Sequence, residues 1–379
     1  MRVLRVAQKV YPDVVGGGPY HVHAMSRDQA AMGHDVTVLT VDHDGDRPHV
    51  ETREGYTVVR YPAMATPLGN AIAPALGQFL RNCGSYDVVH AHSHLYLATN
   101  LAALQRRLGD TPLAITNHGL YSQNAPAWVF DLYLRTLGRW TFDAADAVFC
   151  YTDADRDRLR ARGVSTRIDV IPNGIDTTWF TPDGQTHDGV QGDPAILFVG
   201  RLVEGKRPID ALAAVSRLHE DYPNATLTVC GEGPMRETLA QYARKRGLES
   251  ALHCLGHVDY EAMPGVYRAA DALVLPSQAE GFPRTVLEAL ATDTPVVVSD
   301  LPGLEPVING GGETVAVGDV AGFATALGRV LGGEYRPADT ITDRYDWADT
   351  VARTTTVLKG LAGLDPRQIG RDEIAGDNP

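Results

Sequence analysis

Two glutamates eight positions apart, Glu280 and Glu288, are the residues of this sequence whose setting most clearly suggests chemistry. They lie in the stretch 276–290, which reads PSQAEGFPRTVLEAL and follows a short apolar run that predicts a buried strand. The stretch predicts a glycine-containing loop and then a helix with Pro283 in its first turn, where a missing N–H costs little. Free N–H groups and the helix dipole both favour an anion at such a helix start. The pattern therefore predicts a site for a phosphate-bearing ligand with a carboxylate on each side.

Cations follow another predicted strand, 195–199. Arg201 comes directly after Gly200, and Lys206 lies five residues further on. Arginine offers a planar fork of donors for phosphate oxygens, and lysine offers a compact point charge. Both could also be solvated surface cations, but Lys206 is one of only four lysines in a chain rich in arginine. We therefore count both as candidate phosphate ligands.

Two further candidates, a glycine loop and a histidine, also follow predicted strands. Gly16, Gly17 and Gly18 would let a backbone approach a ligand closely, although their spacing does not match G-x-G-x-x-G and a flexible turn is the alternative. His118 follows the run 113–116 and could equally be a hydrogen-bonded loop histidine.

The run 90–94 reads HAHSH and places three imidazoles at alternate positions. Alternate residues of a strand share one face, so these side chains could converge on a metal ion. An amidohydrolase-type site would need further ligands on barrel strands, and this chain does not have a barrel pattern. We therefore predict no metal site.

Strand-like and helix-like segments alternate along the chain. The expected strands are 3–7, 36–41, 51–61, 87–91, 113–116, 147–151 and 169–172 in the first half, and 195–199, 225–230, 252–255, 272–275 and 295–298 in the second. The expected helices are 20–32, 95–108, 128–142 and 153–162, then 208–221, 235–247, 260–270, 283–291 and 348–362. This alternation predicts an α/β fold with parallel sheets and crossover helices.

The length of 379 residues exceeds one ordinary core, so we predict two domains. The first would span 1–176, a polar glycine-containing linker 177–194, and the second 195–345; a last helix would lie within 346–364, and 365–379 would be a disordered tail. Two such domains place a cleft between the carboxyl ends of their strands, where ligands usually bind.

The composition excludes several classes of protein. The formal net charge is −13 and no basic stripe is present, which argues against nucleic-acid binding. The four cysteines form no C-x-x-C and predict reduced thiols. No apolar run is long enough to cross a membrane, and the start MRVLRVAQKV reads as a strand rather than a signal peptide. We therefore expect a cytoplasmic protein.

Taken together, these residues resemble the retaining glycosyltransferases of family 4, over about residues 2–360. The most specific match is the family's E-x7-E motif, from Glu280 to Glu288. Supporting matches are GGGPYHV at 16–22, Gly33-His34, IPNGID at 171–176, VGRL…GK at 199–206, GEGP at 231–234, Gly256-His257-Val258 and PVVVSD at 295–300. The resemblance implies GT-B architecture, in which two facing Rossmann-like doubly wound domains enclose a cleft. It also implies that the helix within 346–364 crosses back to the first domain.

The resemblance assigns roles by position. Arg201 and Lys206 would hold the diphosphate of a nucleotide-sugar donor and stabilise the leaving group. Glu280 would contact the transferred sugar, His118 would lie near the sugar's 6-hydroxyl, and Glu288 would accept hydrogen bonds from the ribose. The donor-binding set is completed by Gly16, Gly17, Val258, Gly281 and Phe282, with the backbone near Val258 meeting the nucleobase.

The implied reaction moves a hexose-type sugar from a nucleotide diphosphate sugar to an acceptor hydroxyl, with retained configuration, no cofactor and no metal. The donor would be UDP- or GDP-linked rather than ADP-linked. The enzyme would supply electrostatic stabilisation of the leaving diphosphate, unlike a glycosidase with its acid and nucleophile. Expected acceptors are a glycan, a glycolipid or a lipid-linked saccharide, which would suit loose peripheral association with the inner face of a membrane. We expect a monomer or homodimer.

Two stretches depart from the family pattern. Thr292-Asp293-Thr294 replaces the usual small residues and glycine, and Pro302-Gly303-Leu304-Glu305 lacks the usual glycine pair. The second lies near the expected donor loop and leaves the donor sugar open. Alternatives on the same fold are a nucleotide-sugar epimerase, a phosphorylase and a noncatalytic nucleotide-sugar binder. An NAD-dependent oxidoreductase, with Asp42 at the second strand's end, would need different glycine spacing.

Overall fold

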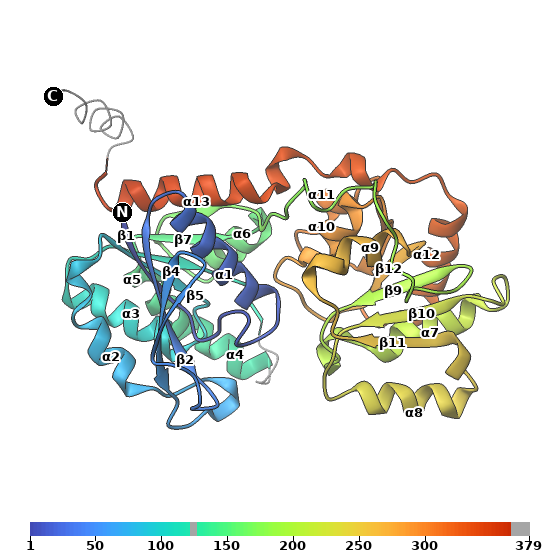
Figure 1. Ribbon diagram of the computed structural model, residues 1–379, viewed down its shortest axis with the longest axis horizontal. Helices are drawn as coiled ribbons and strands as arrows, with labels where there is room; N and C mark the ends of the chain where they lie inside the picture. The colour runs from blue at the N-terminus through green and yellow to red at the C-terminus, as the bar shows by residue number, and fades with distance from the viewer. Residues whose placement is uncertain (122–126, 365–379) are drawn as a thin grey trace. The chain divides into compact units, whose positions relative to one another are not determined.

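The computed structural model describes residues 1–121 and 127–364. The chain forms two compact units (Figure 1). Unit 1 comprises Met1–Pro172 and the described residues from Thr350 onward, and unit 2 comprises Asn173–Asp349. The predicted tail, 365–379, lies outside the described residues.

Unit 1 is built on an eight-stranded sheet in the order β3-β4-β2-β1-β5-β6-β7-β8. Its strands are β1 (Arg2–Val6), β2 (Asp35–Asp42), β3 (Val50–Arg53), β4 (Tyr56–Pro62), β5 (Val88–His92), β6 (Leu113–Thr116), β7 (Ala147–Cys150) and β8 (Ile168–Val170). All neighbouring pairs are parallel except β3 and β4, which form an antiparallel hairpin at one edge. The segment 51–61, expected to be one extended stretch, is therefore this hairpin, because Glu54 and Gly55 both have positive φ and reverse the chain.

Helices cover both faces of this sheet. They are α1 (Gly17–Ala31), α2 (Pro74–Leu80), α3 (Leu97–Leu108), α4 (Ala127–Tyr133), the π-helix η3 (Leu134–Gly138), α5 (Arg139–Ala144), α6 (Asp153–Ala161) and α13 (Trp347–Leu361). Alternate strand residues point to opposite faces: Leu4 packs into the core with α2, α3 and α5, whereas Val3 packs with α1 and α13. This two-sided burial explains why the parallel strands read as continuous apolar runs.

Helix α13 begins in unit 2 and belongs to unit 1 from Thr350 onward. Its residue Leu358 is fully buried in the unit 1 core. Gln29 Nε2 of α1 donates to Thr355 Oγ1 at 2.8 Å, and Arg353 donates to the backbone oxygen of Val170 at 2.8 Å. Thr350 Oγ1 also donates to the backbone oxygen of Pro172 at 2.9 Å, so the helix is fastened to unit 1 by apolar packing and by hydrogen bonds along its length.

Unit 2 is built on a six-stranded parallel sheet in the order β11-β10-β9-β12-β13-β14. Its strands are β9 (Ala195–Val199), β10 (Thr226–Cys230), β11 (Leu252–Gly256), β12 (Ala272–Leu275), β13 (Val296–Ser299) and β14 (Gly312–Val315). Its helices are α7 (Pro208–Leu218), α8 (Arg236–Arg246), α9 (Met263–Arg268), α10 (Arg284–Ala291), α11 (Glu305–Ile308) and α12 (Val320–Gly332).

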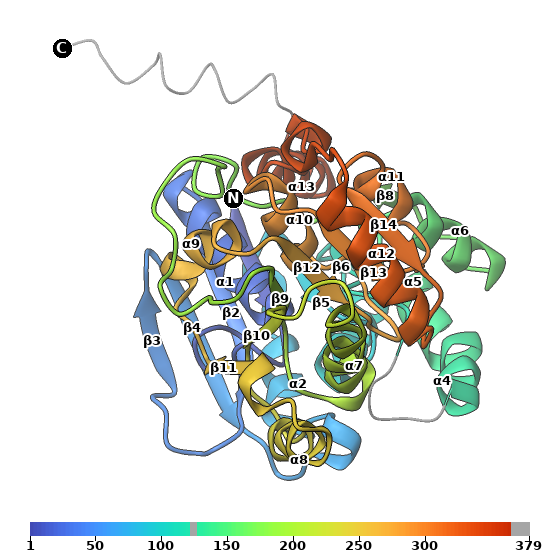
Figure 2. The same cartoon turned by 90° about the vertical axis from the view of Figure 1, so that its right-hand side faces the viewer.

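The helices of unit 2 also divide between two faces. Helices α7, α8 and α12 share one buried cluster with Ile196 and Phe198 of β9, and α7 packs against α12 (Figure 2). The intervening residue Leu197 is buried outside that cluster, and α9 packs against α10. Short 3₁₀ turns complete both units: η1 (Pro67–Gly69), η2 (Cys83–Ser85), η4 (Glu204–Lys206), η5 (Glu249–Ala251), η6 (Tyr260–Ala262), η7 (Pro337–Thr340) and η8 (Asp343–Tyr345).

Residues 177–194, expected to be a linker, belong to unit 2 and contact it at several places. Phe180 is buried with its ring 5.5 Å from that of Tyr260. Arg268 donates to the backbone oxygens of Thr181 and Gln185, at 3.0 and 3.1 Å. Across both described ranges, no helix is long and apolar enough to cross a bilayer.

Candidate active site

Three loops of unit 2 follow the carboxyl ends of adjacent parallel strands. Gly200 and Arg201 follow β9, Gly231 follows β10, and the loop with Glu280 follows β12. Because β9 lies between β10 and β12, the three loops share one edge of the sheet, the usual ligand edge of such folds. Gly231 has φ 140°, and a Cβ there would lie 2.0 Å from the backbone oxygen of Gly200, so only glycine fits.

Lys206 and Glu280 form an ion pair between two of these loops. The Lys206 side chain is 15% exposed and that of Glu280 is 6% exposed. Gln278 N also donates to the backbone oxygen of Gly205 at 2.8 Å, which ties the two loops together. The structure thus brings together two predicted site residues, and any phosphate that binds Lys206 competes with Glu280 for its ammonium group.

Glu288, the second glutamate of the motif, is buried within unit 2 at 5% exposure. Its Oε2 accepts a hydrogen bond from the Tyr267 hydroxyl at 2.8 Å, and its Oε1 lies 3.4 Å from the Tyr260 hydroxyl and 3.6 Å from Arg284 Nε. Burial raises the pKa of Glu288, and the opposing charge and hydrogen bonds of these neighbours do not fully offset it. The carboxylate is therefore held from two helical segments besides its own.

The start of α10 differs from the expectation. Pro283 is the N-cap, with φ −74° and ψ 112°, rather than a residue of the first turn. Its extended ψ leaves it outside the helix, so α10 begins at Arg284. Among the remaining donor-set residues, Phe282 stacks on Tyr345 with ring centroids 6.1 Å apart, and Val258 follows β11.

Three predicted site residues, Gly16, Gly17 and His118, belong to unit 1, where the glycine loop follows β1. Gly16 is the N-cap of α1 with φ 149°, a conformation that side-chain-bearing residues rarely adopt, and α1 begins at Gly17. A Cβ on Gly18 would lie 3.9 Å from His118 Nδ1. The structure therefore brings Gly16, Gly17 and His118 into one region of unit 1.

His118 has a polar partner at each ring nitrogen. Its Nε2 lies 3.0 Å from His92 Nδ1, and its Nδ1 lies 2.7 Å from the Tyr151 hydroxyl. Burial lowers the pKa of His118 to about 4, so the ring is neutral near pH 7. A neutral, oriented imidazole suits hydrogen bonding to a sugar hydroxyl better than it suits neutralising a phosphate.

The histidines of the run 90–94 separate into two places. His90 and His92 share a face of β5, with ring centroids 4.4 Å apart. Ser93 has φ 63°, which breaks the alternation, and His94 packs instead among the rings of Phe130, Tyr133 and Phe142. Within the two described ranges, no group of three or more histidine, cysteine or acidic side chains could hold a metal ion.

An ion-pair network fastens the start of the glycine loop. Asp13 accepts from Arg60 Nε at 2.8 Å and from Arg53 Nη2 at 2.9 Å, and both arginines also pair with Glu51 of the β3–β4 hairpin. Arg53 Nη1 donates to the backbone oxygen of Tyr11 at 2.7 Å. Burial alone would raise the pKa of Asp13, but the hydrogen bonds and charges of the two arginines hold it below its usual value. The hairpin therefore positions the loop electrostatically.

Replacing Asp13 by alanine is expected to lower the free energy of unfolding by about 3–5 kcal/mol, because Arg60 and Arg53 then share the single carboxylate of Glu51 and one buried positive charge is left uncompensated. Urea denaturation measures this change. Asp44→Ala is the control, because Asp44 is 62% exposed and its pair with Arg47 is long, at 3.5 Å. A loss for Asp13→Ala no larger than for Asp44→Ala would contradict the buried network.

Asp42, considered for a dinucleotide site, has a local role. Its carboxylate accepts from the backbone N–H groups of Asp44, Gly45 and Arg47 at 3.0 to 3.2 Å. The side chain therefore organises its own turn, which argues against a role in binding a nicotinamide cofactor.

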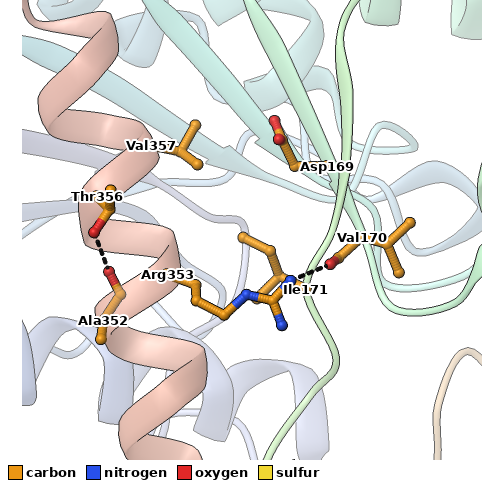
Figure 3. Close-up of a pocket in the computed structure, with 7 residues that line it drawn as sticks. All are labelled: Asp169, Val170, Ile171, Ala352, Arg353, Thr356 and Val357. Carbon is orange, nitrogen blue, oxygen red and sulfur yellow. Dashed lines mark hydrogen bonds between the residues drawn. The ribbon is translucent and has the colours of Figure 1, made fainter. Parts of the chain in front are cut away.

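A cavity of about 340 Å³ lies in unit 1 between β8 and α13. Figure 3 shows its lining, in which Arg353 reaches across to the backbone oxygen of Val170. The lining residues are Asp169, Val170, Ile171, Ala352, Arg353, Thr356 and Val357. None of the predicted site residues lines this cavity.

Several polar neighbours of the site were not predicted from the sequence. Tyr151, His92 and Tyr267 contact predicted residues from other elements, so only the fold could place them. Arg284 is different, because it lies inside the motif, one turn before Glu288. A buried arginine at that spacing could have been suspected from the i, i+4 rule.

The chain belongs to glycosyltransferase family 4. Residues 15–179 match Glycosyltransferase Family 4, and residues 185–345 match Glycosyl transferases group 1. A glycogen synthase of Mycobacterium tuberculosis is 34% identical over 408 residues, covering 97% of this chain and 96% of that protein. A phosphatidyl-myo-inositol mannosyltransferase of Mycolicibacterium smegmatis is 28% identical, covering 97% of each chain.

Solved structures show the same fold. A sucrose-phosphate synthase from Thermosynechococcus elongatus has a TM-score of 0.80 at 20% identity, covering 96% of this chain and all of that one. Anabaena Alr3699/HepE, solved in complex with UDP-glucose, has a TM-score of 0.74 at 16% identity and covers 95% of this chain and 100% of its own. The predicted GT-B class, with its pair of Rossmann-like α/β domains, is confirmed, and the protein is a glycosyltransferase.

Proposed function

We propose that this enzyme moves a hexose from a nucleotide diphosphate sugar to an acceptor hydroxyl, with retention of configuration and without a divalent metal. The observation that carries the proposal is the ion pair between Lys206 and Glu280. Glu280 lies in the loop before α10, and the buried Glu288 lies within α10. Unit 2 therefore holds a cation for phosphate next to a carboxylate for the sugar, and the same loop and helix supply a second carboxylate for the ribose.

In this proposal Lys206 and Arg201 bind the diphosphate, with backbone amides near Gly16 and Gly17 assisting from unit 1. When the diphosphate takes the Lys206 ammonium, Glu280 is released to accept hydrogen bonds from the sugar hydroxyls. His118 binds the 6-hydroxyl, Glu288 binds the ribose, and Val258 lies at the nucleobase, with Gly281 and Phe282 shaping the loop between them. The nucleotide is UDP or GDP rather than ADP.

The chemistry follows from these charges. The acceptor hydroxyl attacks the anomeric carbon from the face that the diphosphate leaves. The bond between the anomeric carbon and the phosphate oxygen breaks as the new glycosidic bond forms, and the acceptor's proton passes to that departing oxygen, so the configuration is retained. Charge develops on the departing phosphate, where Lys206, Arg201 and a set of amides stabilise it. Neither glutamate acts as a proton donor in this scheme, because both carboxylates are engaged in binding.

The acceptor belongs to the class of glycans, glycolipids or lipid-linked saccharides. The names of two relatives, a glycogen synthase and a phosphatidyl-myo-inositol mannosyltransferase, span that range. Exposed Trp128 and Leu132 of α4, at 72% and 56%, suit an acceptor with a lipid anchor. We place the enzyme in the cytoplasm, with loose contact at the inner face of the membrane.

Thermal unfolding with UDP-, GDP- and ADP-sugars tests the donor assignment. A ligand at 100 times its Kd should stabilise the wild-type protein by about 2.7 kcal/mol.

Glu288→Gln should raise the donor KM about 10- to 100-fold, because hydrogen bonds to a charged group contribute roughly 1.5–3 kcal/mol.

Glu313→Gln is the matched control for this experiment. Glu313 also accepts from an arginine and a tyrosine, Arg329 and Tyr335, but it lies near the amino end of β14, away from the ligand edge. Failure of every nucleotide sugar to stabilise the wild-type protein would refute the donor site. Analysis of the reaction products separates transfer from the alternatives, because an epimerase leaves the sugar on its nucleotide and a noncatalytic binder yields no product.

A further inference from the structure

Arg284 is a buried cation between the two motif glutamates, with 8% of its side chain exposed. Its Nη1 donates to the backbone oxygen of Gly174 at 3.0 Å, and its Nη2 donates to the Tyr260 hydroxyl at 2.8 Å. Its Nε lies 3.6 Å from Glu288 Oε1, and the guanidinium lies 5.5 Å from the centre of the Trp347 ring. One side chain therefore contacts four different parts of unit 2.

Two of these contacts lie where the chain enters and leaves unit 2, which starts at Asn173 and ends at Asp349. Gly174 lies in the entering segment and Trp347 in the leaving segment. The two segments pair with each other, because Ile175 N donates to the Tyr345 oxygen at 2.9 Å and Trp347 N donates to the Ile175 oxygen at 2.7 Å. Arg284 thus joins a predicted ribose ligand to both connecting segments of the chain.

The planar fork of an arginine is necessary for this arrangement. Nη1, Nη2 and Nε point to three different acceptors, whereas the ammonium of a lysine is a single point on a flexible stem. The donors are directed at a backbone oxygen, a hydroxyl and a carboxylate, which distinguishes Arg284 from a phosphate-binding arginine. Its position as the first residue of α10 leaves it one helical turn from Glu288.

We propose that Arg284 is a positioning residue, which orients the Glu288 carboxylate for the ribose of the donor and couples it to the two segments that connect the units. This inference rests on the proposed role of Glu288 in donor binding. It implies that a nucleotide engaging Glu288 also restrains, through Arg284, the backbone around Gly174. Arg284 does not contact the reacting atoms.

The pH dependence of donor binding separates this role from simple packing. The charged and titratable groups that face Glu288 are Arg284 on its own helix, Tyr260 of η6 and Tyr267 of α9, with Cys230 of β10 next to Tyr267. Arg284 is the only cation in that set, and its charge favours the ionised carboxylate. Its removal should move the pH below which donor binding is lost to a higher value.

Arg284→Met and Arg284→Lys provide the test, with the KM for the UDP- or GDP-sugar that binds the wild-type protein measured from pH 5.5 to 8.5. Arg284→Met should raise the donor KM about tenfold for each pH unit by which the midpoint moves, and kcat at saturating donor should change little. Arg284→Lys keeps a charge without the fork and should lie between Met and the wild-type protein. In wild-type protein, the same nucleotide should slow amide exchange at 173–177, and in Arg284→Met it should not.

Arg268→Met is the control, because Arg268 also donates to two backbone oxygens of unit 2, those of Thr181 and Gln185, without contacting Glu288. An unchanged pH midpoint and donor KM in both Arg284 variants would overturn the inference, even if they were less thermostable. Loss of donor binding in Glu288→Gln together with wild-type behaviour of Arg284→Met would refute only this inference. Absence of any nucleotide binding by the wild-type protein would instead refute the proposed function on which it rests.

Discussion

Lys206→Ala is expected to lower kcat about 100- to 1,000-fold. The lysine is the compact cation nearest to Glu280, and in the proposed reaction it stabilises the negative charge that develops on the departing diphosphate. Removal of one such preorganised group costs about this factor in other enzymes. Steady-state kinetics with saturating donor and acceptor measure the loss.

The same substitution is also expected to destabilise the fold, by about 3 kcal/mol, for a reason unrelated to catalysis. Glu280 is 6% exposed and would lose its partner. A carboxylate left unpaired in a buried position is costly, whereas the intact pair contributes little net stability. A fall in activity alone would therefore not distinguish a catalytic lysine from a structural one.

The double variant Lys206→Ala/Glu280→Gln separates the two effects. A neutral amide needs no cation, so the melting temperature should return close to that of the wild-type protein. Activity should remain low, because the diphosphate still lacks its ammonium. Recovery of activity together with stability would show that Lys206 only neutralises Glu280, and it would remove the lysine from the proposed mechanism.

Much of the fold could be predicted from the sequence because parallel strands buried on both faces leave a clear signal. Runs such as AILFV at 195–199 and ALVL at 272–275 became β9 and β12 with the same bounds. The strand β14 was missed, because its residues GETV contain a single large apolar side chain. Helix α12 was missed although Asp319 caps it, accepting from Gly322 N at 2.8 Å. That capping residue was a readable signal.

The candidate site shows a different limit. Motif spacing predicted which residues gather at the strand ends, but not which of them pair with one another. The ion pair between Lys206 and Glu280 joins residues 74 positions apart. The contact between His92 and His118 joins two strand ends that only the sheet order makes neighbours. Such pairings depend on loop geometry of a few ångströms, which side-chain type and periodicity do not encode.

Those histidines lead to the second large effect, acid unfolding of unit 1. Burial lowers the pKa values of several histidines in unit 1, to about 3 for His94 and to about 4 for His118. Two others are His90 and His92. In the unfolded chain each would titrate near pH 6.5. Between those values the unfolded state binds more protons than the folded state. Above about pH 6.5 these histidines therefore do not lower the free energy of unfolding of unit 1. As the pH falls below that value, the free energy of unfolding decreases progressively.

The expected loss is large because several groups act together. Each histidine costs at most about 1.4 kcal/mol per pH unit below its unfolded pKa, so His94 and His118 together cost about 3 kcal/mol between pH 6.5 and pH 5. Burial also lowers the pKa values of His90, His92 and His34, and these groups add to the loss. The total is a large part of the stability of an ordinary domain, about 5–15 kcal/mol, so unit 1 is expected to unfold at acidic pH. Hydrogen exchange followed by mass spectrometry, from pH 7.5 to 4.5 with correction for intrinsic rates, would assign the transition to unit 1.

His94→Phe tests whether buried histidines cause this transition. Neither ring nitrogen of His94 makes a hydrogen bond of ordinary geometry within the described residues. Asn117 is a polar side chain that interacts with the ring, and the neighbours Phe130 and Phe142 are apolar rings. A phenyl ring can replace the imidazole at the cost of the contact with Asn117, and it removes one of the titrating groups. The unfolding midpoint should move to lower pH, and the number of protons taken up on unfolding should fall by about one. His257→Gln, at an exposed position of unit 2, should leave the unit 1 midpoint unchanged. An identical midpoint in His94→Phe and wild-type protein would mean that other groups, such as the buried carboxylates, control acid unfolding.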